Sequence, residues 1–496
     1  MSKRHPFLLV AVLLATAVPG RAAELPPTRP PEVRIGGATL TPHLSDRMRG
    51  EIVDWFDPGS AAAPHDNHDY AFFANVLHFG GTLAHRRFTL FADGQYVALA
   101  GLPDDARGLG PGAVYFADNR DTNPMEVFVR EAWLRVPDLG VAGLAVARAG
   151  RFKFDDGLET IGRTKHPMLA WVKRLRVSQR LLGNFDYTHA GRSFDGGVLA
   201  YDRGPYNATL MGGKPTRGGF NVSANPHLDG ISTVYLALTA TEPDWWPLAD
   251  LRLFYDYYRD ERPLAATDNR ALDARAADAG EDVALHTAGG HLVKIWPVGP
   301  GAADTMVWGV GQAGDWKSLD HTAWAVAAEA GYRLADVPWT PWLRAGYFRG
   351  SGDDDPADGD HDTFFQILPT SRLYALTPFY NLMNNQDVFA QLILKPLASV
   401  LLRLDYHYLE VAADDDLVYA GGGATREDRS FGYAGFPARG ASSLAHHVDL
   451  TLLWTVNRHL DLAVYCGHAV GREVVDRQFP GGSSLNYAYL ETTLAW

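Results

Sequence analysis

Apolar and polar residues alternate along several segments of the chain, which is typical of β-strands with one apolar face. Between residues 400 and 408 the even positions hold Val, Leu, Leu, Tyr and Tyr, while Arg403, Asp405 and His407 hold odd positions. The same alternation occurs at residues 88–96, 251–258 and 448–456. We therefore predict an all-β fold.

Alternation by itself fits both a soluble β-sandwich and a transmembrane β-barrel. Three features favour the barrel. Aromatic residues cluster at strand ends, as at residues 255–258, and long acidic or glycine-rich insertions alternate with short turns. The final segment, residues 486–496, also alternates and ends in Trp496, like the last strand of outer-membrane barrels. The predicted fold is a transmembrane antiparallel up-and-down β-barrel with long extracellular loops and short periplasmic turns.

The first residues have the layout of a secretory signal. Lys3 and Arg4 precede an apolar run over residues 7–18, and small residues follow, so we expect cleavage after Ala22. The run is short for a membrane anchor, and no later segment contains the roughly 20 apolar residues of a transmembrane helix.

The chain accordingly divides into three parts. These are a signal peptide over residues 1–22, a proline-rich lead-in over residues 23–32 and a barrel over residues 33–496. We expect the barrel to be integral to the outer membrane, in contact with lipid and lipopolysaccharide.

Composition excludes some partners. The chain has 45 Lys and Arg against 58 Asp and Glu, giving a net charge of −13, and it has no run rich in Lys or Arg. A nucleic-acid partner is therefore not expected. Cys466 is the only cysteine in the sequence, so neither an internal disulfide nor a cysteine-based metal cluster is expected.

Long polar insertions are predicted to be loops, and the one at 260–285 has the composition of a short loop helix. They lie near residues 57–69, 101–124, 260–285, 350–362 and 412–440. The acidic run at residues 353–360 lacks the spacing and closing Glu of an EF-hand loop. It is interpreted as a solvated acidic loop, with a loop-bound divalent cation or a bridge to lipopolysaccharide as the alternative. No other cofactor is expected.

Catalytic motifs are absent from the sequence. It contains no G-x-S-x-G, H-E-x-x-H or Walker motif. Asp155, Asp156 and Glu159 resemble the carboxylates of glycoside chemistry, but an acidic turn explains them more simply. His446 and His447 are adjacent, and adjacent residues of a strand face opposite sides, so they cannot chelate one ion together. We do not expect an enzyme.

A series of short motifs resembles the alginate-export porins, a family of outer-membrane barrels with 18 strands. In order, the motifs lie at residues 150–157, 192–197, 255–260, 286–291, 329–332, 351–353 and 447–450. They extend the resemblance over roughly residues 33–496. The family often has Glu before the last motif, where this chain has His446 and His447. The resemblance implies 18 strands and transport of an alginate-like polymer.

If the apolar positions face lipid, the other positions line a pore rich in cations. The predicted pore-lining residues are Arg47, Arg49, Arg87, Arg135, Arg151, Lys153, Arg252, Lys294, Arg333, Arg344 and Arg403. A basic constriction attracts carboxylates, and uronate polymers carry one carboxylate per sugar. The alternative is that these cations pair with acidic residues across strands. The acidic candidates are Glu51, Asp93, Glu131, Glu329 and Asp405.

The resulting hypothesis is a channel for an anionic polysaccharide, such as an alginate-like uronate polymer or its oligomers. Transport would be driven by diffusion or by periplasmic secretion components. The alternative is a porin for small anionic nutrients or other small solutes.

Overall fold

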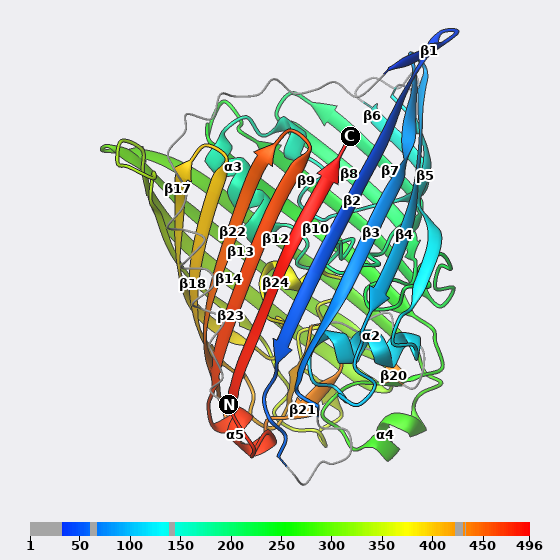
Figure 1. The fold of residues 1–496 in the computed structure, drawn as a ribbon. Coiled ribbons are helices and arrows are strands. Elements are labelled where there is room, and N and C mark those ends of the chain that lie inside the picture. Colours follow the sequence, from blue (N-terminus) through cyan, green and yellow to red (C-terminus); the bar gives the residue numbers. More distant parts are fainter. Residues whose placement is uncertain (1–31, 60–66, 138–143, 422–429, 432) are drawn as a thin grey trace.

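The chain forms a closed antiparallel β-barrel in which each wall strand pairs with its neighbours in sequence (Figure 1). The computed structural model describes residues 32–59, 67–137, 144–421, 430–431 and 433–496. The last wall strand closes the barrel by pairing with the first, from Ser45 opposite Ala495 to Asp54 opposite Asn486. The all-β prediction and the count of 18 wall strands are both confirmed for the described residues.

The wall strands are β2 (Ala38–Asp54), β3 (Asp69–His85), β4 (Phe88–Ala100), β5 (Met125–Val136), β6 (Leu144–Phe152), β7 (Phe194–Arg203), β8 (Tyr206–Pro215), β9 (Ile231–Thr241), β10 (Ala249–Asp260), β12 (Val283–Val298), β13 (Gly301–Trp316), β14 (Leu319–Leu334), β15 (Trp342–Gly350), β17 (Gln386–Leu397), β18 (Val400–Glu410), β22 (Ser443–Asn457), β23 (Leu460–Gly471) and β24 (Ser484–Ala495).

The two ends of the barrel differ in the length of their connections. At the short-turn end, several strand pairs are joined by two residues: 86–87, 204–205, 299–300, 398–399 and 458–459. The carboxyl terminus and β1 (Val33–Ile35) lie at this end (Figure 1). The long-loop end carries connections at 55–68, 101–124, 153–193, 216–230, 261–282, 351–385, 411–442 and 472–483. Short turns face the periplasm in outer-membrane barrels.

The loop predictions are mostly confirmed, with three omissions. The connections at 153–193, 216–230 and 472–483 were not predicted, and the connection after β15 runs to residue 385 rather than 362. One connection at the long-loop end, residues 317–318, is short. The predicted signal peptide and nearly all of the lead-in lie outside the described residues.

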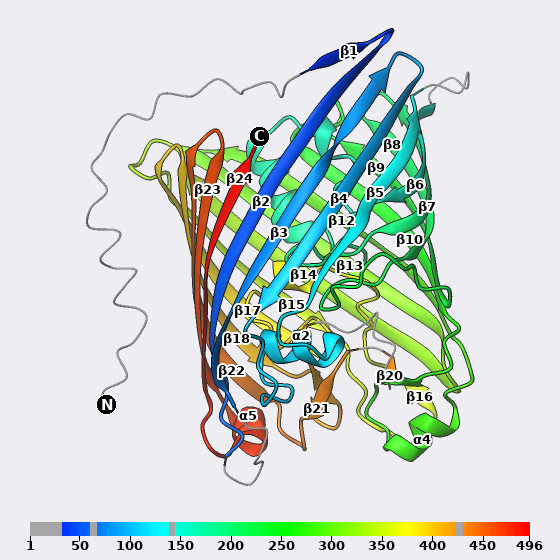
Figure 2. The same ribbon diagram turned by 45° about the vertical axis from the view of Figure 1, so that its right-hand side comes forward.

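Small elements gather at the long-loop end (Figure 2). They include α2 (Pro111–Asn119), α4 (Leu272–Ala277), α5 (Glu473–Gln478), β16 (Asp360–His361) and the short pairs β11 (Ala265–Ala266) with β20 (Ser430–Phe431) and β19 (Leu417–Tyr419) with β21 (Gly435–Pro437). The helix predicted within 260–285 is α4. Among the described helices, none has the length and apolar content to cross a membrane.

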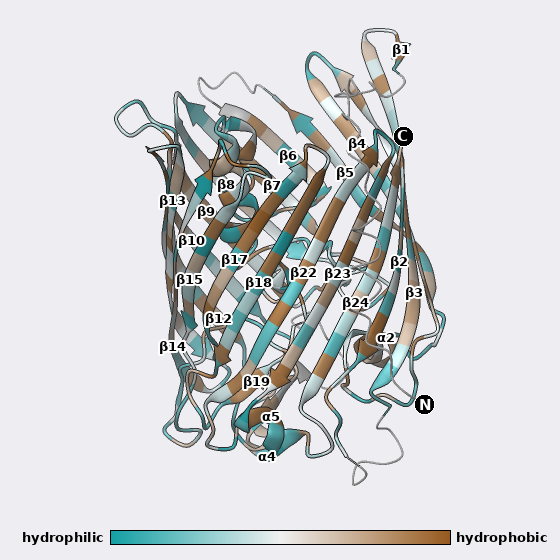
Figure 3. Cartoon of the chain, turned by 60° about the vertical axis from the view of Figure 1, so that its left-hand side comes forward, coloured by the Kyte–Doolittle hydropathy of each residue, from teal (hydrophilic) through white to brown (hydrophobic). Residues whose placement is uncertain are grey.

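The two faces of the wall follow the predicted alternation on several strands. On β10, the Leu253 side chain is 69% exposed on the outside, whereas Arg252 and Asp256 are buried inside. On β18, Leu404 is exposed outside and Asp405 is buried. Apolar positions recur along the outer wall formed by β17, β18, β22 and β23 (Figure 3). These exposed apolar faces would meet lipid.

Exposed tryptophans mark the short-turn end of the outer wall. They are Trp245, Trp296, Trp339, Trp454 and Trp496. Tryptophan prefers the membrane–water interface, because its ring is amphipathic. These side chains therefore place one edge of the hydrocarbon layer near the short turns.

Two long connections fold into the barrel instead of covering its end. We call residues 153–193 the first inward loop and residues 351–385 the second inward loop. Each begins where a short strand ends, at Phe152 and at Gly350, whereas β12, β13 and β14 each have 16 residues. The chain therefore leaves the wall before it reaches the rim, and its backbone enters the lumen.

The first inward loop contains η2 (Ile161–Arg163), α3 (Pro167–Val172) and the π-helix η3 (Lys173–Val177), and the second contains η4 (Ser371–Leu373). The two loops bond to each other inside the barrel. Leu368 N–H donates to Leu181 O at 2.8 Å, and Gly183 N–H donates to Leu368 O at 2.8 Å. Mutual bonding satisfies backbone groups that would otherwise be buried without partners.

Apolar side chains of the inward loops pack against the inside of the wall. Leu169 and Val172 of α3 belong to one buried cluster with Trp308 and Trp342 of the wall. Burial of a Leu or Val side chain contributes about 1.5–3 kcal/mol. The lumen is thus partly filled by an apolar core that no strand periodicity predicts.

The assignment of outer and inner wall faces is testable with two leucines at adjacent pairing positions of β18 and β22. Leu402 lies on the outer face of β18, and Leu453 faces a hollow inside the barrel next to Leu401. We expect Leu402→Arg to destabilise the barrel by about 1–4 kcal/mol, depending on depth, because the guanidinium would enter lipid. Leu453→Arg, which faces water, should cost less than 1 kcal/mol. Urea unfolding in vesicles measures both, and equal losses would contradict the assignment.

Candidate functional site in the barrel lumen

Eight of the predicted pore-lining residues lie on the lumen side. Seven are on inward-facing strand positions: Arg47, Arg49, Arg135, Arg252, Arg333, Arg344 and Arg403. Lys153 follows the end of β6 and reaches Asp186 and Glu131 inside the barrel.

The other three predictions are wrong. Arg87 lies in the exposed two-residue turn between β3 and β4 and is not part of the lumen wall. Arg151 faces outward, where its Nε and Nη2 donate to Asp195 at 2.7 Å each. Lys294 also faces outward, between the rings of Trp246 and Trp296.

The errors at Arg151 and Lys294 have one physical cause. Their apolar neighbours Phe152, Val293 and Ile295 are fully buried in the core that the first inward loop forms with the wall. The apolar positions therefore face the lumen here, and the charged positions face outward. The rule that apolar positions face lipid fails where a loop makes the lumen apolar.

Wall cations in the middle of the barrel hold the first inward loop. Arg252 pairs with Glu159 of that loop and donates to the hydroxyl of Tyr235 at 2.9 Å. The loop in turn supplies cations to wall acids: Lys173 Nζ lies 2.6 Å from Asp250 Oδ2, and both side chains are fully buried. Glu159 thus serves as an ion-pair partner that joins the first inward loop to the wall.

Glu329 on β14 is the centre of a buried cluster of guanidinium groups. Arg176 and Arg180 of the first inward loop approach its oxygens at 2.8 and 3.4 Å, and Arg344 of β15 at 3.0 Å. Arg344 is also bonded to Asp304 at 2.9 Å. Arg176 and Arg180 were missed, because they lie on an inward loop with no strand alternation. The cross-strand alternative considered from sequence describes Arg344 and Glu329 correctly.

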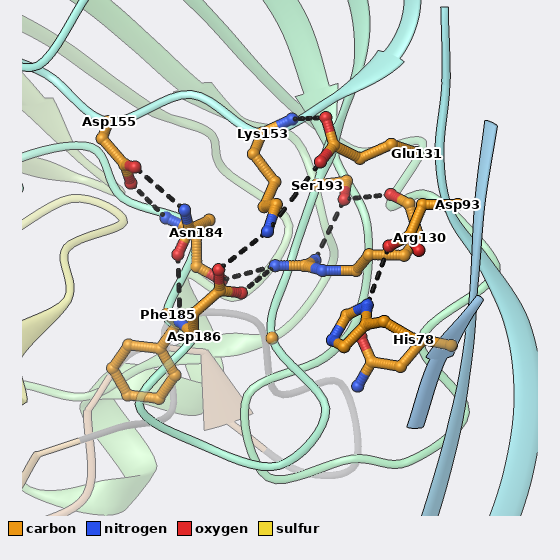
Figure 4. Close-up of polar contacts among 12 residues, drawn as sticks. His78, Asp93, Arg130, Glu131, Lys153, Asp155, Asn184, Phe185, Asp186 and Ser193 are labelled. Atoms are coloured by element: carbon orange, nitrogen blue, oxygen red, sulfur yellow. Dashed lines mark hydrogen bonds and ion pairs between the residues drawn. The ribbon is translucent and has the colours of Figure 1, made fainter. Parts of the chain in front are cut away.

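Asp186, in the last part of the first inward loop, contacts Arg130 of β5 and Lys153, the residue that follows β6 (Figure 4). Its carboxylate accepts from Arg130 and, at 3.0 Å, from Lys153, and Arg47 donates to its backbone oxygen at 2.9 Å. The Asp186 side chain is 46% exposed, so water reaches this side of the lumen. The side chain of Lys153 beside it is also partly exposed.

Histidines border the same space. Asp93 on β4 lies 2.8 Å from His78 Nδ1 and 2.9 Å from His43 Nε2, and both histidines are partly exposed (Figure 4). Asp93 therefore pairs with histidines of the wall, and it does not pair with a predicted arginine in the described part of the chain.

Arg49 and Arg403 also form ion pairs with neighbouring side chains. Arg49 Nη2 lies 2.6 Å from Glu491 Oε2, and its guanidinium packs between the rings of Tyr187 and Tyr489. Arg403 Nε lies 2.8 Å from Asp405 Oδ2. Both arginines therefore stabilise the lumen wall.

Three lumen-facing arginines near the short-turn end form no ion pair within the described residues. Arg135 and Arg148 lie opposite each other on β5 and β6, and Arg333 projects from β14 on the other side of the barrel. Arg148, which was not predicted, packs over the rings of Trp133 and Phe152. Their guanidinium groups are available to carboxylates that reach this part of the lumen.

Two hollows open among these elements near the short turns. Arg333 lines one of about 410 Å³ with His166 and Met168 of the first inward loop. The other, of about 350 Å³, is lined by Lys395, Glu491 and further residues of β17 to β24. The short-turn half of the lumen therefore has both space and positive charge.

The acidic run lies at the long-loop end, where Asp354, Asp355 and Asp358 are exposed. Asp353 is buried, and its N–H donates to Asp416 Oδ2 at 3.2 Å. Burial raises the pKa of Asp353 to about 7 and that of Asp416 to about 6. The loop-bound cation stays a prediction.

His446 and His447 face opposite sides of β22, as predicted. His446 Nδ1 lies 2.8 Å from the hydroxyl of Tyr406 on the outer face, whereas His447 is buried in the lumen.

Comparisons with known proteins agree with this geometry. The family model for alginate export matches residues 104–480. Two solved structures from Pseudomonas aeruginosa resemble the fold: OccK9 (OpdG), with 12% identity and a TM-score of 0.57, and OccK2 (OpdF), with 10% identity and a TM-score of 0.57. Each alignment covers 92% of this chain, with 98% of OccK9 and 97% of OccK2.

A third similar structure is Pseudomonas aeruginosa OpdK with vanillate, which has 11% identity, a TM-score of 0.54 and coverage of 92% of this chain and 98% of that one. No curated protein matches the chain. At these identities the structures establish the fold alone, a closed antiparallel β-barrel.

The charge balance beside Asp186 is testable by conductance. Asp186→Asn removes a carboxylate from the water-accessible lumen and leaves Lys153 without its closest acid. We expect the ratio of anion to cation permeability, measured from reversal potentials in planar bilayers, to rise at least twofold at low salt and less at high salt, because salt screens exposed charges. The control is Asp358→Asn on an exposed loop. An equal change in both variants would contradict a role for the lumen site.

The buried acids at the long-loop end predict a pH dependence. Because their pKa values are higher in the folded loop than in an unfolded chain, the folded loop binds protons more strongly, and its stability falls as pH rises from about 4 to 7. Limited proteolysis of this loop should therefore be faster at pH 8 than at pH 5. Asp353→Asn should flatten the difference, and an unchanged pH profile in that variant would contradict the assignment.

Proposed function

Because the chain belongs to the alginate export family, we propose that its lumen conducts an anionic carbohydrate, an alginate-like uronate polymer or its oligomers, across the outer membrane. The observation that carries the proposal is a set of three arginines in the short-turn half of the lumen, Arg135, Arg148 and Arg333, which form no ion pair among the described residues. They project from opposite walls, so a solute that passes between them meets guanidinium groups on both sides.

The chemistry of these groups suits carboxylates. A guanidinium holds a carboxylate through two parallel hydrogen bonds, and uronates carry one carboxylate per sugar. Trp133 beside Arg148 adds an apolar surface next to the charge. Conduction requires that the solute bind well enough to enter and weakly enough to leave. A few separated cations meet this condition better than one tight pocket.

The second half of the pathway is proposed to run beside Asp186. Lys153 is partly exposed there and has the Asp186 carboxylate as its partner, whereas Arg47 donates to the backbone oxygens of Asp186 and Thr188. A uronate carboxylate would exchange with the Asp186 carboxylate at Lys153, so that contact with the solute does not leave Lys153 unpaired. For a polymer, periplasmic secretion components would deliver the chain to the short-turn end.

A porin for small anions is the second candidate, and one observation favours it. Two inward loops occupy part of the lumen, and a narrow lumen suits small solutes better than a polymer. OpdK, which shares the fold, was crystallised with vanillate, a small aromatic carboxylate. Both candidates use the same carboxylate chemistry, so only size selectivity separates them.

The unpaired arginines provide the test. In planar bilayers we expect oligouronates added on the short-turn side to block the current, and the combined substitution of Arg135, Arg148 and Arg333 by Ala to weaken the block at least tenfold. Arg151→Ala is the matched control, since Arg151 is three residues from Arg148 and faces outward. Block by small carboxylates but not by oligouronates would support the porin instead. An unchanged block in the triple variant would exclude these arginines from the pathway.

A further inference from the structure

Three side chains with metal-ligand chemistry meet on the inner face of β18 and β22. They are His407, His447 and Asp449, all buried, and one ligand atom from each lies within 4.8 Å of the other two. His407 Nε2 lies 4.0 Å and His447 Nδ1 3.6 Å from Asp449 Oδ2. From this juxtaposition we infer that the lumen wall holds a divalent transition-metal ion, for which Zn²⁺ is the reference.

The spacing of the three groups suits a metal better than hydrogen bonds. Zinc bonds of about 2.0–2.2 Å place tetrahedral ligand atoms about 3.3 Å apart. Asp449 Oδ2 would therefore approach His447 Nδ1 by about 0.3 Å and His407 Nε2 by about 0.7 Å, and the two histidine nitrogens, which lie within 4.8 Å, would close to a similar spacing. The present separations exceed those of hydrogen bonds. His447 Nδ1 and Asp449 Oδ1 are buried and have no hydrogen-bond partner. Buried polar atoms without partners are rare. A bound cation would satisfy His447 Nδ1, and it would also satisfy Asp449 Oδ1 when the carboxylate binds through both oxygens.

The second ring nitrogen of each imidazole, the one that would not bind the metal, already has a polar partner. His407 Nδ1 lies 2.9 Å from Asp387 Oδ2, and His447 Nε2 lies 3.0 Å from Thr377 Oγ1. A carboxylate or other oxygen on the second ring nitrogen is the usual support of a metal-bound histidine, because it fixes the tautomer and the ring orientation. With the proton on the supported nitrogen, the other nitrogen of each ring has a free lone pair for the metal.

The buried carboxylates around these three ligands also favour a bound cation. Asp387, Asp405 and Asp449 are all buried here, and Asp405 lies directly opposite Asp449 in the ladder. Arg403 pairs with Asp405 only. Arg176, which packs over the nearby ring of Phe389, is bonded to Glu329. His407 pairs with Asp387, whereas Asp449 has no Lys or Arg partner among the described residues, so its buried charge favours a bound cation.

The donor set selects the class of metal. Two imidazole nitrogens and one carboxylate suit Zn²⁺ and similar transition-metal ions, whereas Ca²⁺ and Mg²⁺ prefer oxygen ligands throughout. Because Thr377 belongs to the second inward loop, an occupied site would join that loop to the wall through His447. The ion would therefore stabilise the arrangement of the loop inside the lumen. This role does not depend on which solute the channel conducts.

Zinc binding to the full-length chain in detergent tests the proposal. After treatment with EDTA, titration against a competing chelating dye should show one Zn²⁺ per chain. We expect His407→Ala and His447→Ala each to weaken binding at least tenfold. The matched control is His446→Ala, one residue away on the outer face. Zinc should also raise the temperature of the heat-dependent shift in gel mobility for the wild type and His446→Ala, but not for His447→Ala.

A second variant keeps the test decisive if the alanine variants do not fold. Asp387→Asn preserves side-chain volume, and loss of this support should weaken zinc binding 10- to 100-fold. Heat-dependent gel mobility shows whether each variant forms the barrel. The proposal is overturned if the folded wild type binds no stoichiometric zinc, if Asp387→Asn binds zinc as the wild type does, or if His446→Ala and His447→Ala lose affinity equally.

Discussion

Closure of the hydrogen-bond ladder is the constraint on which the rest of this structure depends. In lipid, an unpaired strand edge would leave a row of backbone groups without partners, at a cost of several kcal/mol for each group. The pairing of β24 with β2 removes that edge. Once the wall is closed, each strand has one face toward lipid and one toward an enclosed lumen, and the contents of the lumen determine which side chains the inner face requires.

The lumen here contains folded chain as well as water. The first inward loop brings Lys173, Arg176 and Arg180 to wall acids, while wall arginines hold acids of the loop. This reciprocal exchange explains why so many charged side chains are buried in the barrel. It also separates cations that maintain the loop from cations that remain available to a solute. Positive residues on the inner face are therefore not equivalent, and counting them overestimates the number of cations that a solute can reach.

The available cations and the water-accessible acids lie in different parts of the lumen. Arg135, Arg148 and Arg333 are near the short turns, whereas Asp186 with Lys153 lies deeper, in the last part of the first inward loop. In the proposed function, an anion that enters from the short-turn end would first meet arginines that form no ion pair among the described residues, and then Lys153, which it would share with Asp186. Weak contacts of this kind would favour entry and still permit release, as conduction requires.

The sequence by itself determined the all-β fold, the alternating faces of β10 and β18 and the positions of five loops, because strand periodicity depends on residues two positions apart. The strand count came from the family resemblance. The sequence also separated His446 from His447 correctly. Only the tertiary structure decided that Arg151 and Lys294 face outward, since that depends on a loop that turns the local lumen apolar.

The same limit applies to the candidate sites. His407 and His447 are 40 residues apart in the chain and become neighbours only when β18 pairs with β22. Arg176 reaches Glu329 from an inward loop whose course no local pattern encodes. Local periodicity fixes which side chains share a face, because backbone geometry imposes it. Which groups meet across the barrel depends on strand register and loop packing, which arise from contacts between residues far apart in sequence.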